Sequence, residues 1–179
     1  MVRATSDEKA QFRILARIRR MSLGHFGDVK PVGEGVSELR IDYGPGYRVY
    51  LRQQGQMWVL LLAGGNKKTQ TATSPRPNSW PGSGKMNLKT TLWDASEFLD
   101  SPESIAAYLE AVFEVGDPAL IAAALGDVAR AIGMTQLASQ AGVTREALYK
   151  ALSPTGDPKL STFLGVMKAL GLKLAPRAA

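Results

Sequence analysis

Apolar residues recur at helical spacing in the first part of the chain. Between residues 7 and 22 they form one stripe, made of Phe12, Leu15, Ile18 and Met21. Most positions between them are basic or polar, so this segment predicts an amphipathic helix with a charged outer face. We expect a loop over residues 24–35 to follow it, because glycines are frequent there.

Three segments with the alternation of strands come after this loop. They cover residues 36–43, 47–54 and 56–64. Gly44-Pro45-Gly46 joins the first two and Gln54-Gly55 joins the second pair, and both are short hairpin connections. We therefore expect a small antiparallel sheet of three to four strands, backed by the helix. Residues 58–63 are apolar throughout, which favours a central position in this sheet.

Residues 71–86 show neither the helical spacing nor the strand alternation of apolar residues. They contain three prolines and two glycines, which remove backbone donors and add chain entropy. This segment predicts a linker. It would separate a first domain, residues 1–70, from a second domain, residues 87–179.

The sequence of the second domain predicts helices. Asp94 and Glu97 have the spacing of a capping box that opens a short helix. Three pairs of a capping residue and a proline open further helices: Ser101-Pro102, Asp117-Pro118 and Asp157-Pro158. The first two helices are expected near 102–114 and 118–132, and the last one ends at Gly171. Its expected buried stripe is Leu160, Phe163, Leu164, Met167 and Leu170, and residues 172–174 suggest a short terminal strand.

Residues 134–152 predict two short helices joined at a tight turn at Gly142. Apolar positions return at helical spacing on both sides of this glycine: Leu137, Ala138, Ala141, Val143, Ala147, Leu148 and Leu152. Ala138 is small where the helices touch, and Leu148 is expected to face the core. Such a unit can bury one face and place its second helix in a DNA major groove, which is the helix-turn-helix pattern. An ordinary helical hairpin is the alternative.

Polar side chains on the outward face of the second helix are the candidates for DNA contact: Arg145, Glu146, Tyr149 and Lys150. Thr144 is the expected helix cap. Thr135 and Gln136 would approach the DNA backbone from the first helix, and Ser153 and Lys159 would add phosphate contacts. Domains of this kind usually bind two half-sites as dimers, so a homodimer is expected. The last helix and residues 172–174 are a candidate dimer surface, although core packing explains the same stripe equally well.

Composition narrows the chemistry. The chain has no cysteine and a single histidine, His25, which excludes thiolate chemistry and histidine-cluster metal sites. We expect no metal and no cofactor, and we assign His25 to a surface turn. No apolar run approaches the ~18 residues of a membrane span, and the N-terminus lacks a signal-peptide core. A cytoplasmic protein without a membrane partner is the expectation.

The net charge of +6 is unevenly distributed along the chain. Residues 1–85 carry +8, residues 86–129 carry −7 and residues 130–179 carry +5. One interpretation is that two basic surfaces face nucleic acid and the acidic segment between them masks one of the two. The other is that all three are solvated faces without a partner.

Several motifs of the first half occur together in one family: residues 27–30, 33–41, 44–50 and 64–70. They resemble the HigB-type addiction module killer proteins of the RelE/ParE toxin superfamily. Residues 88–175 resemble the partner HigA-like antidote, through Phe98-Leu99, the segment 117–133, the segment 149–152 and the segment 169–172. The resemblance implies an α+β fold, with a small RelE-like domain followed by an all-α helix-turn-helix domain.

The toxin resemblance implies a ribosome-dependent endoribonuclease that cuts mRNA without a metal. A ribose 2′-hydroxyl attacks the adjacent phosphate in this chemistry, and cations neutralise the charge that develops. The matching motif positions of this chain are Arg40, Arg48, Lys67 and Lys68, with Lys30 a weaker candidate. Arg40 and Arg48 lie on neighbouring expected strands and are expected to share a face. For each of these residues a solvated basic side chain is the alternative.

The chain departs from the toxin pattern at both ends of its first half. The N-terminal helical region is shorter than in the family, and the linker stands where family members have a C-terminal helix. This pattern indicates a truncated toxin joined to its antitoxin. It leaves open whether the first half is an enzyme.

These features together lead to the hypothesis that the chain is a toxin–antitoxin fusion. Its antidote half would bind operator DNA and repress its own gene. Its acidic segment, residues 86–129, would cover the toxin face in cis or by domain swapping, with the apolar residues Trp93, Phe98, Leu99, Tyr108 and Phe113. In the alternative, the first half is an active mRNA endoribonuclease held inactive in cis, with the ribosome and mRNA as partners. A third possibility is an interaction scaffold only.

Overall fold

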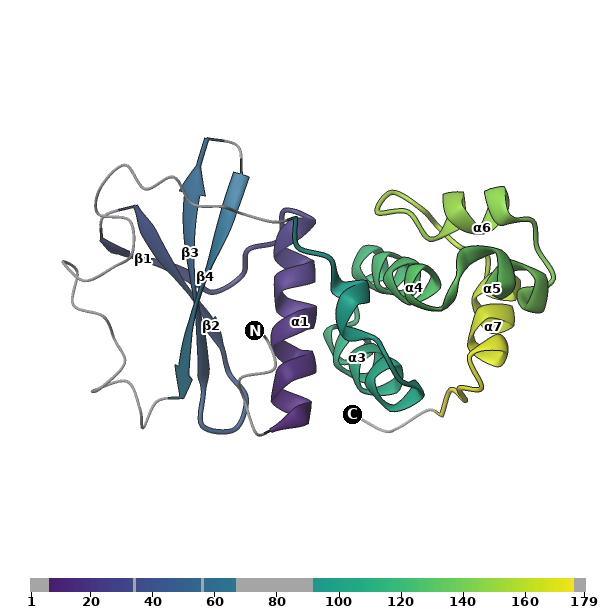
Figure 1. Cartoon of the computed structure of the whole chain (residues 1–179), viewed down its shortest axis with the longest axis horizontal. Coiled ribbons are helices and arrows are strands. Elements are labelled where there is room, and N and C mark those ends of the chain that lie inside the picture. Colours follow the sequence, from purple (N-terminus) through teal and green to yellow (C-terminus); the bar gives the residue numbers. More distant parts are fainter. Residues whose placement is uncertain (1–6, 34, 56, 67–91, 176–179) are drawn as a thin grey trace. The chain divides into compact units, whose positions relative to one another are not determined.

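The computed structural model describes residues 7–33, 35–55, 57–66 and 92–175. The chain forms two compact units, Met1–Trp93 (unit 1) and Asp94–Ala179 (unit 2). The described part of unit 1 contains one helix and an antiparallel sheet, and unit 2 is helical, so the expected α+β class is confirmed (Figure 1). The expected linker, residues 71–86, and the domain boundaries at 70 and 87 lie outside the described residues.

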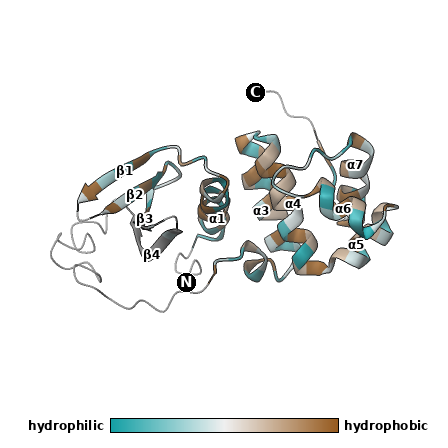
Figure 2. Ribbon diagram, turned by 90° about the horizontal axis from the view of Figure 1, so that it is seen from above, coloured by the Kyte–Doolittle hydropathy of each residue, from teal (hydrophilic) through white to brown (hydrophobic). Residues whose placement is uncertain are grey.

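Helix α1 (Glu8–Ser22) matches the amphipathic helix that the sequence predicts. Asp7 caps its N-terminus, where the carboxylate accepts a 3.1 Å hydrogen bond from the backbone N–H of Ala10. The whole predicted stripe is buried: Phe12, Leu15, Ile18 and Met21. The ribbon of α1 carries both brown and teal residues in Figure 2, as an amphipathic helix requires. Burial of this stripe is what holds the helix on the sheet.

Within the described residues, the sheet has four antiparallel strands in the order β1-β2-β3-β4. Their bounds are β1 Val29–Gly33, β2 Val36–Ile41, β3 Tyr47–Gln54 and β4 Met57–Asn66. Each strand pairs with the next one along the chain, as the two predicted hairpin connections require. In the β2–β3 pair, Arg40 lies opposite Arg48 and Glu38 lies opposite Tyr50. In the β1–β2 pair, Lys30 lies opposite Glu38.

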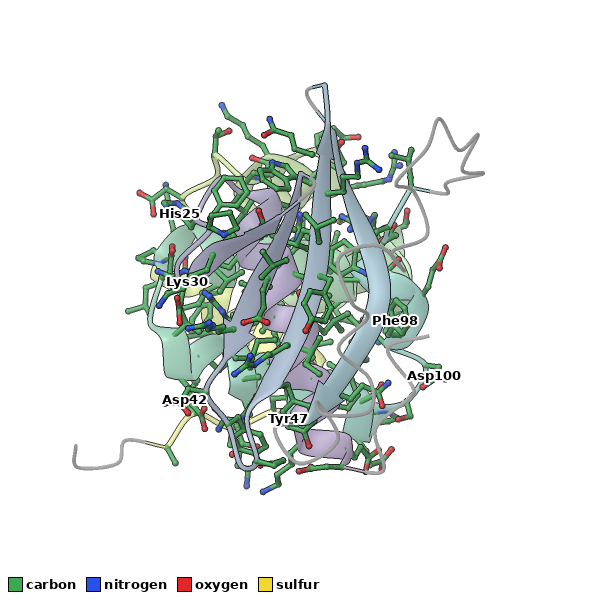
Figure 3. All side chains as sticks on the ribbon, turned by 90° about the vertical axis from the view of Figure 1, so that its left-hand side faces the viewer. His25, Lys30, Asp42, Tyr47, Phe98 and Asp100 are labelled. Carbon is green, nitrogen blue, oxygen red and sulfur yellow. The ribbon has the colours of Figure 1, made fainter. Side chains whose placement is uncertain are left out.

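The two faces of the sheet differ in burial. Alternate residues of a strand point to opposite faces, so Leu39 and Ile41 share one face while Glu38 and Arg40 share the other. Leu39 and Leu51 are fully buried, on the face that α1 covers. The opposite face, which we call the open face, is the one seen in Figure 3. It carries the charged residues of β2 and β3, together with a small buried apolar cluster of Val36 and Tyr50 against which Val32 packs.

Two expectations about the sheet are wrong. The expected loop over 24–35 contains β1, which pairs with β2 although it is short, includes Pro31 and is largely exposed. The apolar strand β4 lies at the edge beside β3, not at the centre, within the described part of the sheet. Apolar composition favoured a central position for this strand, but composition does not identify the neighbours of a strand.

Unit 2 begins with a short 3-10 helix, η3 (Ala95–Phe98), and two longer helices, α3 (Pro102–Val115) and α4 (Pro118–Ile132). Ser101 caps α3 in a reciprocal capping box with Ser104, and the side chain of Asp117 accepts from two backbone N–H groups of α4. Both helices therefore start where the predicted cap–proline pairs place them. A run of buried residues in α4, from Ala122 to Ala129, makes this helix the centre of the unit.

Three shorter helices complete the unit: α5 (Met134–Ala141), α6 (Arg145–Ala151) and α7 (Leu160–Ala169). Helix α7 crosses α5 closely, because a Cβ at Gly165 would lie 2.9 Å from the carbonyl oxygen of Ala141. Val166 and Met167 of α7 are buried, together with Leu137 of α5 and Leu148 of α6.

Four details of unit 2 differ from the sequence-based expectations. Asp94 caps η3 through the N–H of Ser96 and not in a capping box with Glu97. Helix α7 starts at Leu160 rather than at Asp157-Pro158, and residues 172–174 are not a strand. The expected buried stripe is only partly buried, since Leu160 is 70% and Leu164 is 47% exposed.

None of the described helices is by itself long and apolar enough to cross a membrane. Helices α4 and α5 reach that length and composition only as a pair, and they are bent by 113° where they meet.

Candidate functional site

The α5–α6 pair is built around a turn at Gly142. This glycine ends α5 with φ +72°, a left-handed conformation that residues with a Cβ adopt at a cost. Thr144 then caps α6, and its hydroxyl accepts a 3.1 Å hydrogen bond from the N–H of Ala147. Leu137, Ala138 and Leu148 are buried beneath the pair. The turn and the cap are where the sequence predicts them. The expected apolar face is only partly buried, since Ala147 is exposed and Ala141 and Val143 are half-buried.

The outward residues of α6 are exposed. Tyr149 is 67% exposed, although it is a large aromatic side chain, and Arg145, Glu146 and Lys150 are exposed beside it. Teal segments mark this hydrophilic surface of α6 in Figure 2. Leu148 fixes the opposite side of the helix in the core, so the four polar residues project from a helix whose rotation is set by packing.

The other candidate residues for DNA contact lie around the same helix pair. Thr135 and Gln136 are exposed in the first turn of α5, and Lys159 is exposed just before α7. Ser153 is half-buried, and its hydroxyl donates a 3.0 Å hydrogen bond to the carbonyl oxygen of Lys150. Ser153 therefore helps to end α6, a role that the sequence did not assign to it.

A buried polar network fixes the end of α4, directly before α5. Asp127 has no exposed surface and accepts hydrogen bonds from the hydroxyl of Tyr108, at 2.9 Å, and from Arg130, at 2.6 Å. Arg130 also bonds Asp94 at 3.1 Å. Burial disfavours the charged form of Asp94, but hydrogen bonds from Ser96 and Arg130 outweigh it and hold the pKa of this carboxyl below its ordinary value.

Sequence reasoning gave no role to this network. Its members are far apart along the chain, on α3, on α4 and before η3, and only the packing brings them together. The one local signal was the spacing of Asp127 and Arg130, three residues apart on one helix face.

In unit 1 the structure brings together two of the candidate cations. Arg40 donates a 2.7 Å hydrogen bond to Glu38, and Arg48 donates one of 3.2 Å to the same carboxylate. Glu38 is 4% exposed, whereas the side chains of Arg40 and Arg48 are 37% and 27% exposed. The hydrogen bond to Glu38 raises the pKa of Arg40. The open face of the sheet thus carries two cations on one buried anion.

Two more basic residues share this open face. Lys30 is exposed and lies opposite Glu38 on the neighbouring strand, and it is labelled in Figure 3. Arg52 follows Arg48 and Tyr50 on the same face of β3, by strand alternation. The other two candidate cations, Lys67 and Lys68, lie outside the described residues. Glu38 was part of a motif but was given no role, although its two-residue spacing from Arg40 predicts a shared face.

The acidic segment presents a charged stripe on α3. Glu103, Glu110 and Glu114 are exposed and recur at the spacing of one helix face. The sequence also predicted that apolar residues of this segment contact the toxin face, but not all of them lie at the surface. Leu99 and Tyr108 are buried in the core of unit 2, so they contribute to the fold and not to an outer surface.

Fold and site together define a two-unit α+β protein, whose helical unit exposes a polar helix and whose sheet unit exposes a basic face. The comparisons with known proteins specify it further. Residues 89–178 match the family described as "Probable addiction module antidote protein". The chain belongs to this family of addiction module antidote proteins, and this gives it a role in a toxin–antitoxin context.

Two uncharacterized proteins of Haemophilus influenzae are similar to parts of the chain. The first is 49% identical over 81 residues, which cover 45% of this chain and 84% of that protein. The second is 55% identical over 62 residues, which cover 35% of this chain and 63% of that protein. The chain therefore spans less than two thirds of the second relative. No solved structure matches the chain significantly.

Proposed function

We propose that unit 2 is a helix-turn-helix module that binds operator DNA through α6 and so represses transcription of its own gene. The observation that carries this proposal is the exposure of Arg145, Glu146, Tyr149 and Lys150 on a helix anchored by buried Leu148. A recognition helix needs a fixed rotation and an outward face of hydrogen-bonding groups. Exposed Thr135 and Gln136, one helix earlier, are placed to contact the DNA backbone, which sets the register.

The same proposal includes a homodimer. Two half-sites of an operator are read by two copies of such a domain, and each copy needs an apolar surface for the other. Leu160 and Leu164 are exposed one turn apart on α7, on a helix that lies against α5. This pair supports α7 as the contact between two copies.

We further propose that unit 1 is a RelE-like toxin domain of the HigB type and that the acidic stripe of unit 2 masks it. Charge complementarity supports this step. Glu103, Glu110 and Glu114 supply a negative helix face, and the open face of unit 1 supplies Arg40 and Arg48. Opposite charges orient two surfaces and select the partner. The contact forms within one chain or between two chains that exchange units.

Binding to the DNA upstream of the gene tests the first step. We expect the full chain to shift this DNA in a gel, and Arg145→Ala and Lys150→Ala to weaken the shift by about tenfold each. Lys168→Ala is the matched control, because Lys168 is also an exposed cation of unit 2 but lies on α7. If both α6 variants bind as the control does, α6 is not the DNA-binding helix.

A second candidate function is an active mRNA endoribonuclease in unit 1, held inactive by unit 2. The paired cations Arg40 and Arg48 favour it, since such groups neutralise a phosphate during strand cleavage. Changing Glu103, Glu110 and Glu114 to Lys in the full chain is expected to expose the open face and to arrest growth. Adding Arg40→Ala and Arg48→Ala is then expected to restore growth. Harmless expression of the triple Lys variant would contradict this second function.

A further inference from the structure

The two arginines of the open face are arranged in a way that needs an explanation. Arg40 and Arg48 lie directly opposite each other on β2 and β3, and like charges at such positions repel. Glu38 offsets this repulsion, because its carboxylate accepts a hydrogen bond from each guanidinium. The carboxylate is buried while both arginines keep exposed surface. The negative charge is therefore hidden, and the positive charges face outward.

We propose that Glu38 is a positioning residue that aligns Arg40 and Arg48 as a clamp for one phosphodiester group of a nucleic-acid strand. A guanidinium has five N–H donors in a fixed planar arrangement, so a bond to Glu38 orients the group without using up its donors. Two oriented guanidiniums offer a phosphate geometric recognition as well as charge. Holding them in place before the ligand arrives reduces the entropy cost of binding.

The surroundings favour a phosphate of a longer strand over an isolated anion. Lys30 and Arg52 continue the basic surface on either side of the clamp, on β1 and β3. Glu38 and Asp28, which also acts electrostatically on Arg40, offset part of the charge of the four cations. The balance across the three neighbouring strands stays positive. Successive phosphates of a strand would meet successive cations on such a surface. The inference rests on the proposed role of unit 1 in acting on nucleic acid, and it does not depend on operator binding by unit 2.

A substitution at Glu38 distinguishes two explanations of binding, namely arginines positioned by Glu38 and a surface that acts only through its net charge. Glu38→Gln removes a negative charge from a basic face, so a surface that acts only through its net charge would bind nucleic acid more tightly. If Glu38 positions the arginines, the same variant binds more weakly, by about threefold to tenfold. The two explanations thus predict changes of opposite sign.

The measurement is fluorescence anisotropy of the full chain with Glu103, Glu110 and Glu114 changed to Gln, which we call the unmasked chain because the proposed masking stripe is removed. All variants are made in this chain, and the three labelled probes share one sequence: single-stranded RNA, single-stranded DNA and duplex DNA. We expect Arg40→Gln and Arg48→Gln to weaken binding and to lower the salt slope by about one phosphate each. Glu38→Asp, which keeps the charge, is expected to restore part of the affinity that Glu38→Gln loses. Arg19→Gln is the matched control, because Arg19 lies on α1. Comparison of the affinities for the three probes shows whether RNA, single-stranded DNA or duplex DNA supplies the phosphate.

Circular dichroism and the thermal midpoint establish that each variant is folded. The inference is overturned if folded Glu38→Gln binds as tightly as the unmasked chain or more tightly, if neither arginine variant weakens binding, or if the unmasked chain binds none of the probes. Operator binding is measured on the same samples. We expect it to respond to Arg145→Ala and not to Glu38→Gln, so a failure of the clamp is distinguishable from a failure of the proposed function.

Discussion

Arg130 donates a 2.6 Å hydrogen bond to Asp127, a carboxylate that has no exposed surface. Arg130 itself is partly exposed and lies in the last turn of α4, just before Gly133 and α5. The pair therefore fixes the end of the central helix at the point where the helix pair proposed to bind DNA begins. Stability of unit 2 and the placement of α6 are linked through these two residues.

Removal of the cation is expected to be costly. Arg130→Ala leaves the buried charge of Asp127 without its Arg130 hydrogen bond, so the free energy of unfolding of unit 2 should fall by about 2–4 kcal/mol. Urea denaturation followed by circular dichroism measures this change. Arg145→Ala is the control, because Arg145 is exposed and should leave stability nearly unchanged. Equal midpoints for the two variants would contradict a role of the network in stability.

The Asp94 carboxylate makes unit 2 sensitive to acid. Its pKa is held below the ordinary value, mainly by the bonds from Ser96 and Arg130 that outweigh burial, so the folded unit favours the ionised form. The stabilisation is fully present above the unfolded pKa of about 3.9 and is lost as the pH falls through the lower folded value. Thermal midpoints between pH 7 and pH 2.5 should fall less for Asp94→Asn than for the unchanged chain. If the thermal midpoints of the two chains fall in parallel as the pH is lowered, Asp94 contributes nothing to the acid transition.

Gly165 is required by a close helix crossing and not by its backbone angle. Gly→Ala in a helix normally stabilises by up to about 1 kcal/mol. Here the added Cβ would lie 2.9 Å from the carbonyl oxygen of Ala141, so Gly165→Ala should lower the thermal midpoint. Ser161→Ala, at an exposed position of the same helix, should leave the midpoint unchanged or raise it slightly. A higher midpoint for Gly165→Ala would mean that α7 can move away from α5.

The exposed apolar pair on α7 predicts how two copies meet. Leu160→Ser combined with Leu164→Ser should convert a dimer into a monomer in light-scattering measurements, because apolar burial drives such contacts. The thermal midpoint at high dilution should change little, since neither side chain is buried within one copy. A dimer that survives the double substitution places the contact elsewhere on the chain.

Local patterns predicted the elements of this fold well. The stripe of α1, the capping residues Ser101 and Asp117 and the turn at Gly142 each depend on neighbours within a few residues, and each is where the sequence places it. Interactions of this range can be derived from one sequence, because the residues that decide them are adjacent.

Contacts between distant segments could not be predicted in the same way. The edge position of β4 depends on strand pairing, and the exposure of Leu160 depends on which helices reach α7. The bonds that Glu38 makes to Arg40 and Arg48 require the register of two strands. The sequence predicted that Arg40 and Arg48 share a face, but their direct pairing and the bond from Arg48 to Glu38 depend on the register.

The salt dependence of operator binding tests the central proposal most directly, namely that the exposed face of α6 binds duplex DNA. We expect a chain with Arg145→Ala and Lys150→Ala to lose affinity for the upstream DNA by about 100-fold, and its plot of log affinity against log salt to become less steep by about one to two phosphates. Its affinity for a scrambled duplex should fall much less if Arg145 reads bases. An unchanged affinity and slope in the folded double variant would contradict the account.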